Sequence, residues 1–173
     1  MMGSGVLFRE PDSRWLLMLV AVLVIVDQVA KAAIRARLNL YESLTIIPGL
    51  FDLTRVHNAG AAFGMLNAVH FQFKALVLAL VALGALVGVA GYAITLPPSQ
   101  RLARVGLACI VGGAAGNLID RVAAGYVVDF VDVYWRGWHF WAFNVADAAI
   151  TLGVTLMILD LLGVGRHRVS RAL

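Results

Sequence analysis

The sequence predicts an all-α membrane protein, a four-transmembrane-helix bundle with a small extracytoplasmic β-containing cradle between helices 1 and 2. Composition is the first observation behind this prediction: 61% of the residues are hydrophobic, 14% are charged, and the mean hydropathy is +0.87. Such values lie outside the range of soluble globular domains. Length is the second observation, because 173 residues supply about four spans of roughly 20 residues but no further soluble domain. We therefore expect one integral membrane domain over residues 1–173.

Four apolar stretches are long enough to cross a bilayer as helices. They cover residues 15–33, 73–96, 102–119 and 144–164. A short link that contains Pro97 and Pro98 separates the second from the third, so we expect these two helices to be antiparallel neighbours. The cradle, residues 34–72, contains two apolar runs around a Pro-Gly pair, which predicts two short strands lying on the membrane surface.

The distribution of basic residues predicts the orientation of the bundle. With four spans, the two long connections lie on one side of the membrane and both termini lie on the other. The short segments on the terminal side hold seven of the fourteen Lys and Arg residues, namely Arg9, Arg14, Arg101, Arg104, Arg166, Arg168 and Arg171. Because short cytoplasmic segments are enriched in Lys and Arg, we expect both termini in the cytoplasm, although Lys31, Arg35 and Arg37 weigh against this orientation. The net charge of +4 is dispersed, which fits an anionic membrane surface better than nucleic acid.

Two Asn-x-x-Asp pairs lie at the ends of apolar stretches. Asn117 and Asp120 close the third stretch, whereas Asn144 and Asp147 open the fourth. Residues three apart share a helix face, so each amide can hydrogen-bond beside its carboxylate. The N-terminal end of a helix favours negative charge, so we expect Asp147 to be the more readily ionised member of any pair of acids.

A further acid, Asp129, lies in the apolar run Val127-Val128-Asp129-Phe130. Apolar surroundings raise the pKa of a carboxyl group by desolvation. Carboxylates in or beside a membrane are costly and are tolerated mainly where they face a partner or a wet cavity. Asp129 and Asp147 are therefore candidates for an aspartic-protease pair, in which one acid activates water and the other donates a proton.

Structural roles are the alternatives for these acids. Asp147 could serve only to cap the fourth helix, and Asp120 could form an ion pair with Arg121 next to it. Asp27 and Lys31, spaced i, i+4, could neutralise each other or face a substrate. A small proton- or ion-coupled transporter is the alternative function, but it would place acids near mid-bilayer and contain inverted repeats, which this sequence lacks.

Five motifs follow one another in the order expected of bacterial lipoprotein signal peptidases, also called signal peptidase II. The motifs are Asp27-Gln28-x-x-Lys31, the run HNAGAAF at 57–63, GGAAGNLIDR at 112–121, VVDF at 127–130 and FNVAD at 143–147. The chain resembles that family from about Trp15 to Val164. The resemblance implies an aspartic endopeptidase of the bacterial cytoplasmic membrane that needs no metal or other cofactor. Its substrates would be prolipoproteins, cleaved just before a diacylglyceryl-modified cysteine.

The resemblance also implies roles for individual residues. The aspartates of the fourth and fifth motifs, Asp129 and Asp147, would be the catalytic pair. Supporting roles in binding and orientation would fall to Asn58, Gly60, Asn117, Asp120, Arg121, Asn144, Asp27 and Lys31. We expect a monomer whose partners are its prolipoprotein substrates and membrane lipid, with the active site near the extracytoplasmic surface and the cradle over the substrate.

Overall fold

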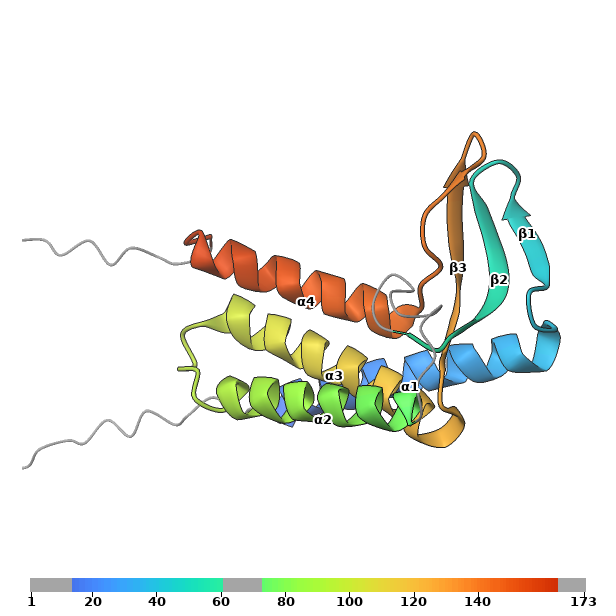
Figure 1. Cartoon of the computed structure of the whole chain (residues 1–173). Helices are drawn as coiled ribbons and strands as arrows, with labels where there is room; N and C mark the ends of the chain where they lie inside the picture. The colour runs from blue at the N-terminus through green and yellow to red at the C-terminus, as the bar shows by residue number, and fades with distance from the viewer. Residues whose placement is uncertain (1–13, 61–72, 165–173) are drawn as a thin grey trace, which may run out of the picture.

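The computed structural model describes residues 14–60 and 73–164, which fold into four helices and a four-stranded antiparallel sheet (Figure 1). In chain order the elements are α1 (Arg14–Arg37), β1 (Ser43–Ile47), β2 (Phe51–Asn58), α2 (Lys74–Ala93), α3 (Arg101–Ala124), β3 (Val127–Trp135), β4 (Trp138–His139) and α4 (Val145–Leu161). The strands lie in the order β1-β2-β3-β4. The chain is a mostly helical membrane protein whose sheet stands at one end of the helix bundle.

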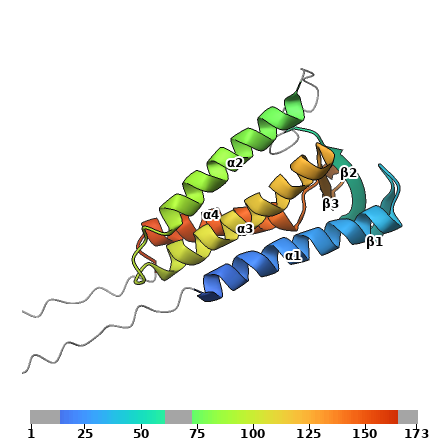
Figure 2. The same ribbon diagram turned by 90° about the horizontal axis from the view of Figure 1, so that it is seen from below.

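The helices run lengthwise through the bundle, and the sheet stands across one end of it (Figures 1 and 2). α1 and α3 run toward the sheet, whereas α2 and α4 run away from it. The start of α1, the turn between α2 and α3, and the end of α4 therefore lie at the opposite end. α2 and α3 are antiparallel neighbours, as the short link between them predicts.

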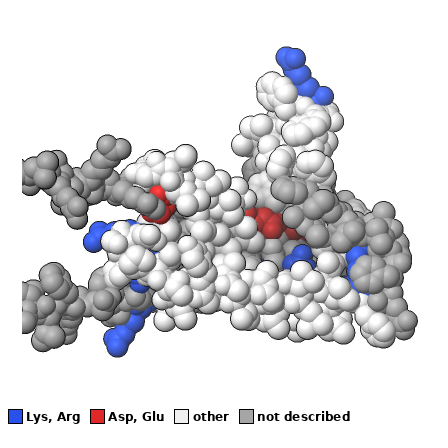
Figure 3. All heavy atoms as spheres, turned by 60° about the vertical axis from the view of Figure 1, so that its left-hand side comes forward, with Lys and Arg blue, Asp and Glu red and all other residues white. Residues whose placement is uncertain are grey.

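Three helices, α1, α2 and α3, are long and apolar enough to span a membrane. α4 has 17 residues and lies beside α3 along the bundle, and its crossing of the membrane stays a prediction. On the face seen in Figure 3, charged atoms are sparse along the flank of the bundle. Such a flank suits contact with lipid, where every charged group is costly.

The sheet corrects the prediction of an all-α fold with strands only between helices 1 and 2. β1 and β2 lie there, close to the two predicted runs, but β3 and β4 come from the connection between α3 and α4. The overlooked signal is a run rich in β-branched and aromatic residues, Val127 to Trp135, which favours a strand. It ends in a tight turn in which Arg136 and Gly137 have φ values of 49° and 81°, the positive values that suit a hairpin.

A small hydrophobic core joins the sheet to the bundle. Ile34 and Leu38 at the end of α1 pack against Val128 and Phe130 of β3. β3 in turn pairs with β2 in an antiparallel ladder that ends at the pair Asn58 and Val127. This core fixes the beginning of β3 at the junction between sheet and helices.

α3 approaches its neighbours closely because glycines occupy the contact points. A Cβ atom on Gly113 would collide with the carbonyl oxygen of Ala146 in α4. Toward α1, a Cβ atom on Gly116 would lie only 2.6 Å from the Asp27 carboxylate. Only the absence of a side chain leaves room for the facing helix at these positions, a device common in membrane bundles.

Some positions used in the sequence analysis lie outside the described residues. They are Arg9, the basic residues between 166 and 171, and residues 61–72, which include the end of the second motif and part of the predicted cradle.

Candidate active site

Strand β3 directs Asp129 away from the core that anchors the strand. Its neighbours Val128 and Phe130 belong to that core. Because successive side chains of a strand point to opposite faces, Asp129 projects from the other face of β3. The residue is nevertheless only 2% exposed. β3 thus holds a carboxyl group in an enclosed position where the sheet meets the helices.

The first turn of α4 fixes Asp147. Asn144 is the N-cap residue, and its side-chain oxygen accepts a hydrogen bond of 2.9 Å from the Asp147 backbone N–H. The Asp147 carboxylate accepts one of 3.3 Å from the Asn144 N–H, which completes a capping box. The Ala146 N–H donates to Asp27 of α1 at 3.0 Å, so another helix satisfies a further free N–H of this helix end. Asp147 is therefore held where the helix dipole stabilises a carboxylate.

Three asparagines join the two carboxyl groups into one hydrogen-bonded network. Asn58 and Asn144 each donate to a different oxygen of Asp129, at 3.0 and 2.7 Å. Asn117 of α3 donates to Asp147 at 2.8 Å and accepts from Asn144 at 3.1 Å. Side-chain amides carry no charge, so these bonds orient both carboxyl groups without neutralising them. Among the described residues, no salt bridge reaches Asp129 or Asp147.

A group of charged residues lies beside this network, between α1 and α3. The Lys31 ammonium lies 2.8 Å from the Asp27 carboxylate and 3.0 Å from that of Asp120, and it donates to the Asn117 side chain at 2.9 Å. Arg35, one turn further along α1, contacts Asp120 at 2.7 Å. We call Asp27, Lys31, Arg35 and Asp120 the charged cluster. Lys31 therefore connects the charged cluster to the amide network through Asn117.

The ion pair considered between Asp120 and Arg121 does not form. Neighbouring residues on a helix point about 100° apart, so the two side chains face different neighbours. Asp120 faces α1, whereas Arg121 donates to the backbone carbonyl oxygens of Asn117 and Gly60, both at 3.3 Å. The Gly60 N–H donates in turn to the Asn58 side chain at 3.0 Å. Arg121 thereby ties the end of β2 to α3.

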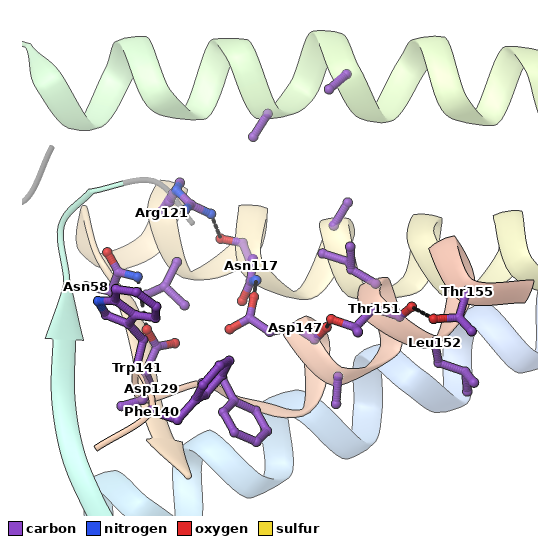
Figure 4. A pocket seen from close by; sticks show the side chains of 18 residues that line it. Asn58, Asn117, Arg121, Asp129, Phe140, Trp141, Asp147, Thr151, Leu152 and Thr155 are labelled. Atoms are coloured by element: carbon purple, nitrogen blue, oxygen red, sulfur yellow. Dashed lines mark hydrogen bonds between the residues drawn. The ribbon is translucent and has the colours of Figure 1, made fainter. Parts of the chain in front are cut away.

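A cavity of about 850 Å³ lies at the two carboxyl groups (Figure 4). Its polar end is lined by Asn58, Asn117, Arg121, Asp129 and Asp147. Most of the remaining wall consists of apolar residues from α2, α4 and the connection that precedes α4. In the space-filling view, acidic and basic atoms are exposed near the foot of the sheet (Figure 3). The cavity therefore combines a few convergent polar groups with an apolar interior, as ligand sites commonly do.

Burial raises the pKa of Asp129 to about 7, and the charge of Asp147 acts in the same direction. The hydrogen bonds from Asn58 and Asn144 act in the opposite direction but do not cancel the desolvation. A carboxyl group with this pKa is protonated in part of the molecules at neutral pH. It can therefore donate a proton in one step of a reaction and accept one in another.

The predicted site residues fall into two adjoining groups. Around the polar end of the cavity lie Asn58, Gly60, Asn117, Arg121, Asp129, Asn144 and Asp147, and in the charged cluster lie Asp27, Lys31 and Asp120. Within the described residues, no three His, Cys, Asp or Glu side chains form a group able to hold a metal ion.

Sequence reasoning missed three polar side chains at or beside the cavity, namely Arg35, Thr151 and Thr155. Arg35 follows Asp27 and Lys31 at intervals of four residues, so the α1 face of the charged cluster was visible in the sequence. Thr151 and Thr155 follow Asp147 at the same interval and line the cavity with it. A search for polar residues on one helix face of the fourth apolar stretch would have found both threonines.

The sequence is similar along most of its length to proteins of one family. The family described as signal peptidase (SPase) II matches residues 19–163. The lipoprotein signal peptidase of Geobacter metallireducens is 43% identical over 153 residues, which cover 88% of this chain and 93% of that protein. The lipoprotein signal peptidase of Symbiobacterium thermophilum is 47% identical over 151 residues, which cover 87% of this chain and 95% of that protein.

The fold is also similar to a solved structure, described as a bacterial membrane enzyme determined by the in meso method at 2.3 Å resolution. The two structures superpose with a TM-score of 0.78 at 30% sequence identity, over 91% of this chain and 93% of the other. The arrangement of helices and sheet is therefore shared with an experimentally determined membrane enzyme.

A helical membrane protein with two buried or half-buried aspartates on one cavity, joined by uncharged amides, has the features of a membrane aspartic peptidase. The similarities to known proteins identify one family within this class. The chain belongs to the lipoprotein signal peptidase family, SPase II, the membrane aspartic proteases that process prolipoproteins. The family resemblance inferred from five sequence motifs is thereby confirmed.

Proposed function

We propose that Asp129 and Asp147 are the catalytic pair of this peptidase and that they hydrolyse the peptide bond just before a diacylglyceryl-modified cysteine. The observation that carries the proposal is the shared cavity. Both carboxyl groups line its polar end, and hydrogen bonds through Asn117 and Asn144 connect them. The apolar remainder of the cavity suits a substrate that is anchored in the bilayer by lipid.

The reaction begins with Asp147 ionised and Asp129 protonated. The helix end that holds Asp147 favours a carboxylate, and the pKa of Asp129 near 7 favours retention of its proton. Asp147 removes a proton from water, the water oxygen attacks the scissile carbonyl carbon, and Asp129 donates its proton to the carbonyl oxygen. The tetrahedral intermediate then returns a proton to Asp129, Asp147 protonates the leaving nitrogen, and the C–N bond breaks. The starting protonation states are restored, and the coupled pair can exchange roles.

The supporting residues act on the catalytic pair and on the substrate. Asn58 and Asn144 hold the two oxygens of Asp129, while Asn117 holds Asp147. Arg121 lines the cavity and already binds the Gly60 carbonyl oxygen, so it can bind a substrate carbonyl in the same way. The charged cluster contributes indirectly, because Lys31 fixes the amide of Asn117 that donates to Asp147.

We further propose that all of residues 1–173 form one domain of the bacterial cytoplasmic membrane, with both termini in the cytoplasm. The arrangement of the helices supports this orientation. The start of α1, the turn before Arg101 and the end of α4 all lie at the end of the bundle opposite the sheet (Figure 1). Asp129 and Asp147 then lie near the extracytoplasmic surface. A single chain supplies the residues of the cavity described above, so we propose a monomer as the working unit.

The orientation is tested by cysteine labelling in intact cells. In a Cys109→Ala background, a cysteine introduced at Arg101 should stay unlabelled by an impermeant reagent until the membrane is permeabilised. A cysteine introduced at Arg136, at the tip of the β3–β4 hairpin, should be labelled at once. The reverse result would invert the proposed orientation.

The catalytic proposal is tested with purified protein, a precursor peptide that carries the diacylglyceryl cysteine, and a chelator in the buffer. The wild type should release the signal peptide at the bond before the modified cysteine. Asp147→Asn keeps the size of the side chain but removes the acid, so its turnover should fall by about three orders of magnitude or more. Retained turnover in a folded Asp147→Asn protein would exclude the pair, and loss of wild-type activity with chelator would point to a metal.

A further inference from the structure

The helix face that carries Asp147 continues along the cavity with two hydroxyl groups. Thr151 and Thr155 follow Asp147 at one and two helical turns, and all three residues line the cavity (Figure 4). Both threonines are exposed rather than packed in the bundle. The Thr151 hydroxyl donates to the Asp147 carbonyl oxygen at 2.9 Å, and the Thr155 hydroxyl donates to the Thr151 carbonyl oxygen at 2.8 Å.

These bonds determine what the hydroxyl groups can offer to a ligand. A hydroxyl group has one hydrogen to donate and two lone pairs that accept. Because each hydrogen is already bound to a carbonyl oxygen of α4, the free capacity of both groups is as acceptors. The facing wall of the cavity is supplied by small apolar residues, among them Ala82 and Ala85 of α2 and Ala114 of α3. This part of the cavity therefore presents acceptors in otherwise apolar surroundings.

A peptide that is being cut needs such acceptors. The chain around the scissile bond has to leave the helical conformation to reach the catalytic pair, and its backbone N–H groups then lose their helical partners. In apolar surroundings an N–H group without an acceptor costs about 1–3 kcal/mol. The ester groups of a diacylglyceryl chain have no hydrogen to donate, so they gain nothing from acceptors. The chemistry of the two threonines thus suits the peptide and not the lipid.

We propose that Thr151 and Thr155 bind the segment of the signal peptide that precedes the scissile bond, by accepting hydrogen bonds from its backbone N–H groups. This inference rests on the proposed catalytic pair, because Asp147 defines the end of the cavity from which the segment extends. The side chains of the segment play no part in these contacts. The threonines therefore contribute affinity for an unwound backbone of varied sequence.

Substitution by valine tests the proposal, because valine keeps the branched shape of threonine and loses the hydroxyl group. Thr151→Val and Thr155→Val should each raise the KM for the lipid-modified precursor peptide about fivefold, the effect of one ordinary hydrogen bond, with kcat within about twofold of wild type. Thr151→Ser and Thr155→Ser keep the hydroxyl group and should retain the wild-type KM. Thr95→Val is the matched control, since the Thr95 hydroxyl donates to the Tyr92 carbonyl oxygen in the same manner at the far end of α2.

A second series changes the substrate. Precursor peptides in which one backbone amide before the scissile bond is replaced by an ester lack that N–H group without added bulk. One such ester should raise the wild-type KM about as much as Thr151→Val does, and it should have no further effect on the Thr151→Val enzyme. An unchanged KM in both valine variants would overturn the proposal. It would also be overturned if every ester raised the KM of the Thr151→Val enzyme as much as it raises the KM of the wild type. The variant Asp147→Asn distinguishes a failure of the catalytic proposal from a failure of the threonine proposal. If Asp147→Asn is inactive while the valine variants match wild type, only the role of the threonines is wrong.

Discussion

Two sets of aspartates lie within one bundle, and they differ in what surrounds them. Asp27 and Asp120 in the charged cluster are 0% and 1% exposed, and each contacts the Lys31 ammonium. Asp129 is similarly buried at 2% exposure, but it receives hydrogen bonds from amides, as does Asp147. What distinguishes Asp129 from the aspartates of the charged cluster is therefore the charge of its hydrogen-bond partners and not the depth of burial.

This comparison distinguishes structural acids from reactive ones. A carboxylate with a cation beside it is stabilised in its charged form and has little tendency to take up a proton. A carboxylate held only by amides is oriented equally well, yet it keeps the cost of its buried charge, and that cost favours protonation. In this protein the Asn117 amide connects the two sets, because it donates to Asp147 and accepts from Lys31, the cation that contacts Asp27 and Asp120.

The largest expected effect comes from exchanging carboxylate for amide in each set. Asp129→Asn should lower turnover by about three orders of magnitude or more, because an amide can act neither as acid nor as base. Asp120→Asn should lower stability by about 1–3 kcal/mol and keep measurable turnover, since Lys31 retains its contact with Asp27. Cleavage assays and thermal unfolding in detergent measure the two effects. If folded Asp120→Asn were inactive and Asp129→Asn fully active, Asp120 would replace Asp129 in the catalytic pair.

Removal of the Lys31 ammonium from the charged cluster should have the next largest effect. Lys31→Met leaves the Asp27 carboxylate buried without the ammonium, which should cost about 3–5 kcal/mol in the free energy of unfolding. The variant Asp27→Asn combined with Lys31→Met should recover part of that loss, because asparagine can still accept the Ala146 N–H. Unfolding in detergent of the two single variants and the double variant measures the coupling. Equal stability of Lys31→Met and wild type would show that the charged cluster is not structural.

The pH dependence of the protein should follow Asp129. Its pKa is raised from 3.8 to about 7 in the folded protein, so the folded state retains a proton that the unfolded chain releases between these values. Stability should therefore fall as pH rises from about 4 to about 7, with a limit on the order of 4 kcal/mol when Asp129 is fully ionised. Catalytic efficiency should decline above about pH 7, where the proton donor is lost, with an apparent pKa that belongs to the coupled pair. Asp129→Asn should remove this part of the stability slope, and an unchanged slope would contradict the assignment.

A smaller effect is expected from the packing that positions Asp147. Gly113→Ala would press against the carbonyl oxygen of Ala146, so the first turn of α4 has to move. We expect a loss of about 1–3 kcal/mol in stability and about a tenfold loss in turnover. Gly88→Ala on α2 is the control, because nothing lies within 4 Å of its added Cβ atom and the helix gains from alanine. Equal turnover in the two variants would mean that the catalytic geometry tolerates a shift of α4.

Much of the bundle could be predicted because the bilayer restricts what an apolar chain can form. Long apolar stretches had to become helices, and the link at Pro97 and Pro98 had to join antiparallel neighbours. The strand from Val127 to Trp135 was overlooked because its pairing is decided by distant residues, the ladder to β2 and the packing on Ile34 and Leu38. The preference of β-branched residues for strands was present in the sequence, but strand pairing depends on the tertiary contacts.

The sequence by itself determined which chemistry is available. Acids in apolar runs, with asparagines three residues before two of them, indicate groups that need partners in a membrane protein. The N-terminal end of α4 is a local feature, and the favourable position of Asp147 was predicted from it, whereas the capping box itself is a finding of the structure. The family resemblance, carried by short ordered motifs, also required nothing beyond the sequence.

Only the tertiary structure decided which acid meets a cation. Asp120 is adjacent to Arg121 in the chain, yet its cations are Lys31 and Arg35 of α1, more than eighty residues away. Among the described residues, the side-chain hydrogen bonds that reach Asp129 come from amides, because β3 turns its side chain away from the core and toward Asn58 and Asn144. A pKa depends on burial and on charges a few ångströms away, and these are properties of how helices and strands pack. The sequence therefore supplied the acids, and packing determined which of them can exchange a proton.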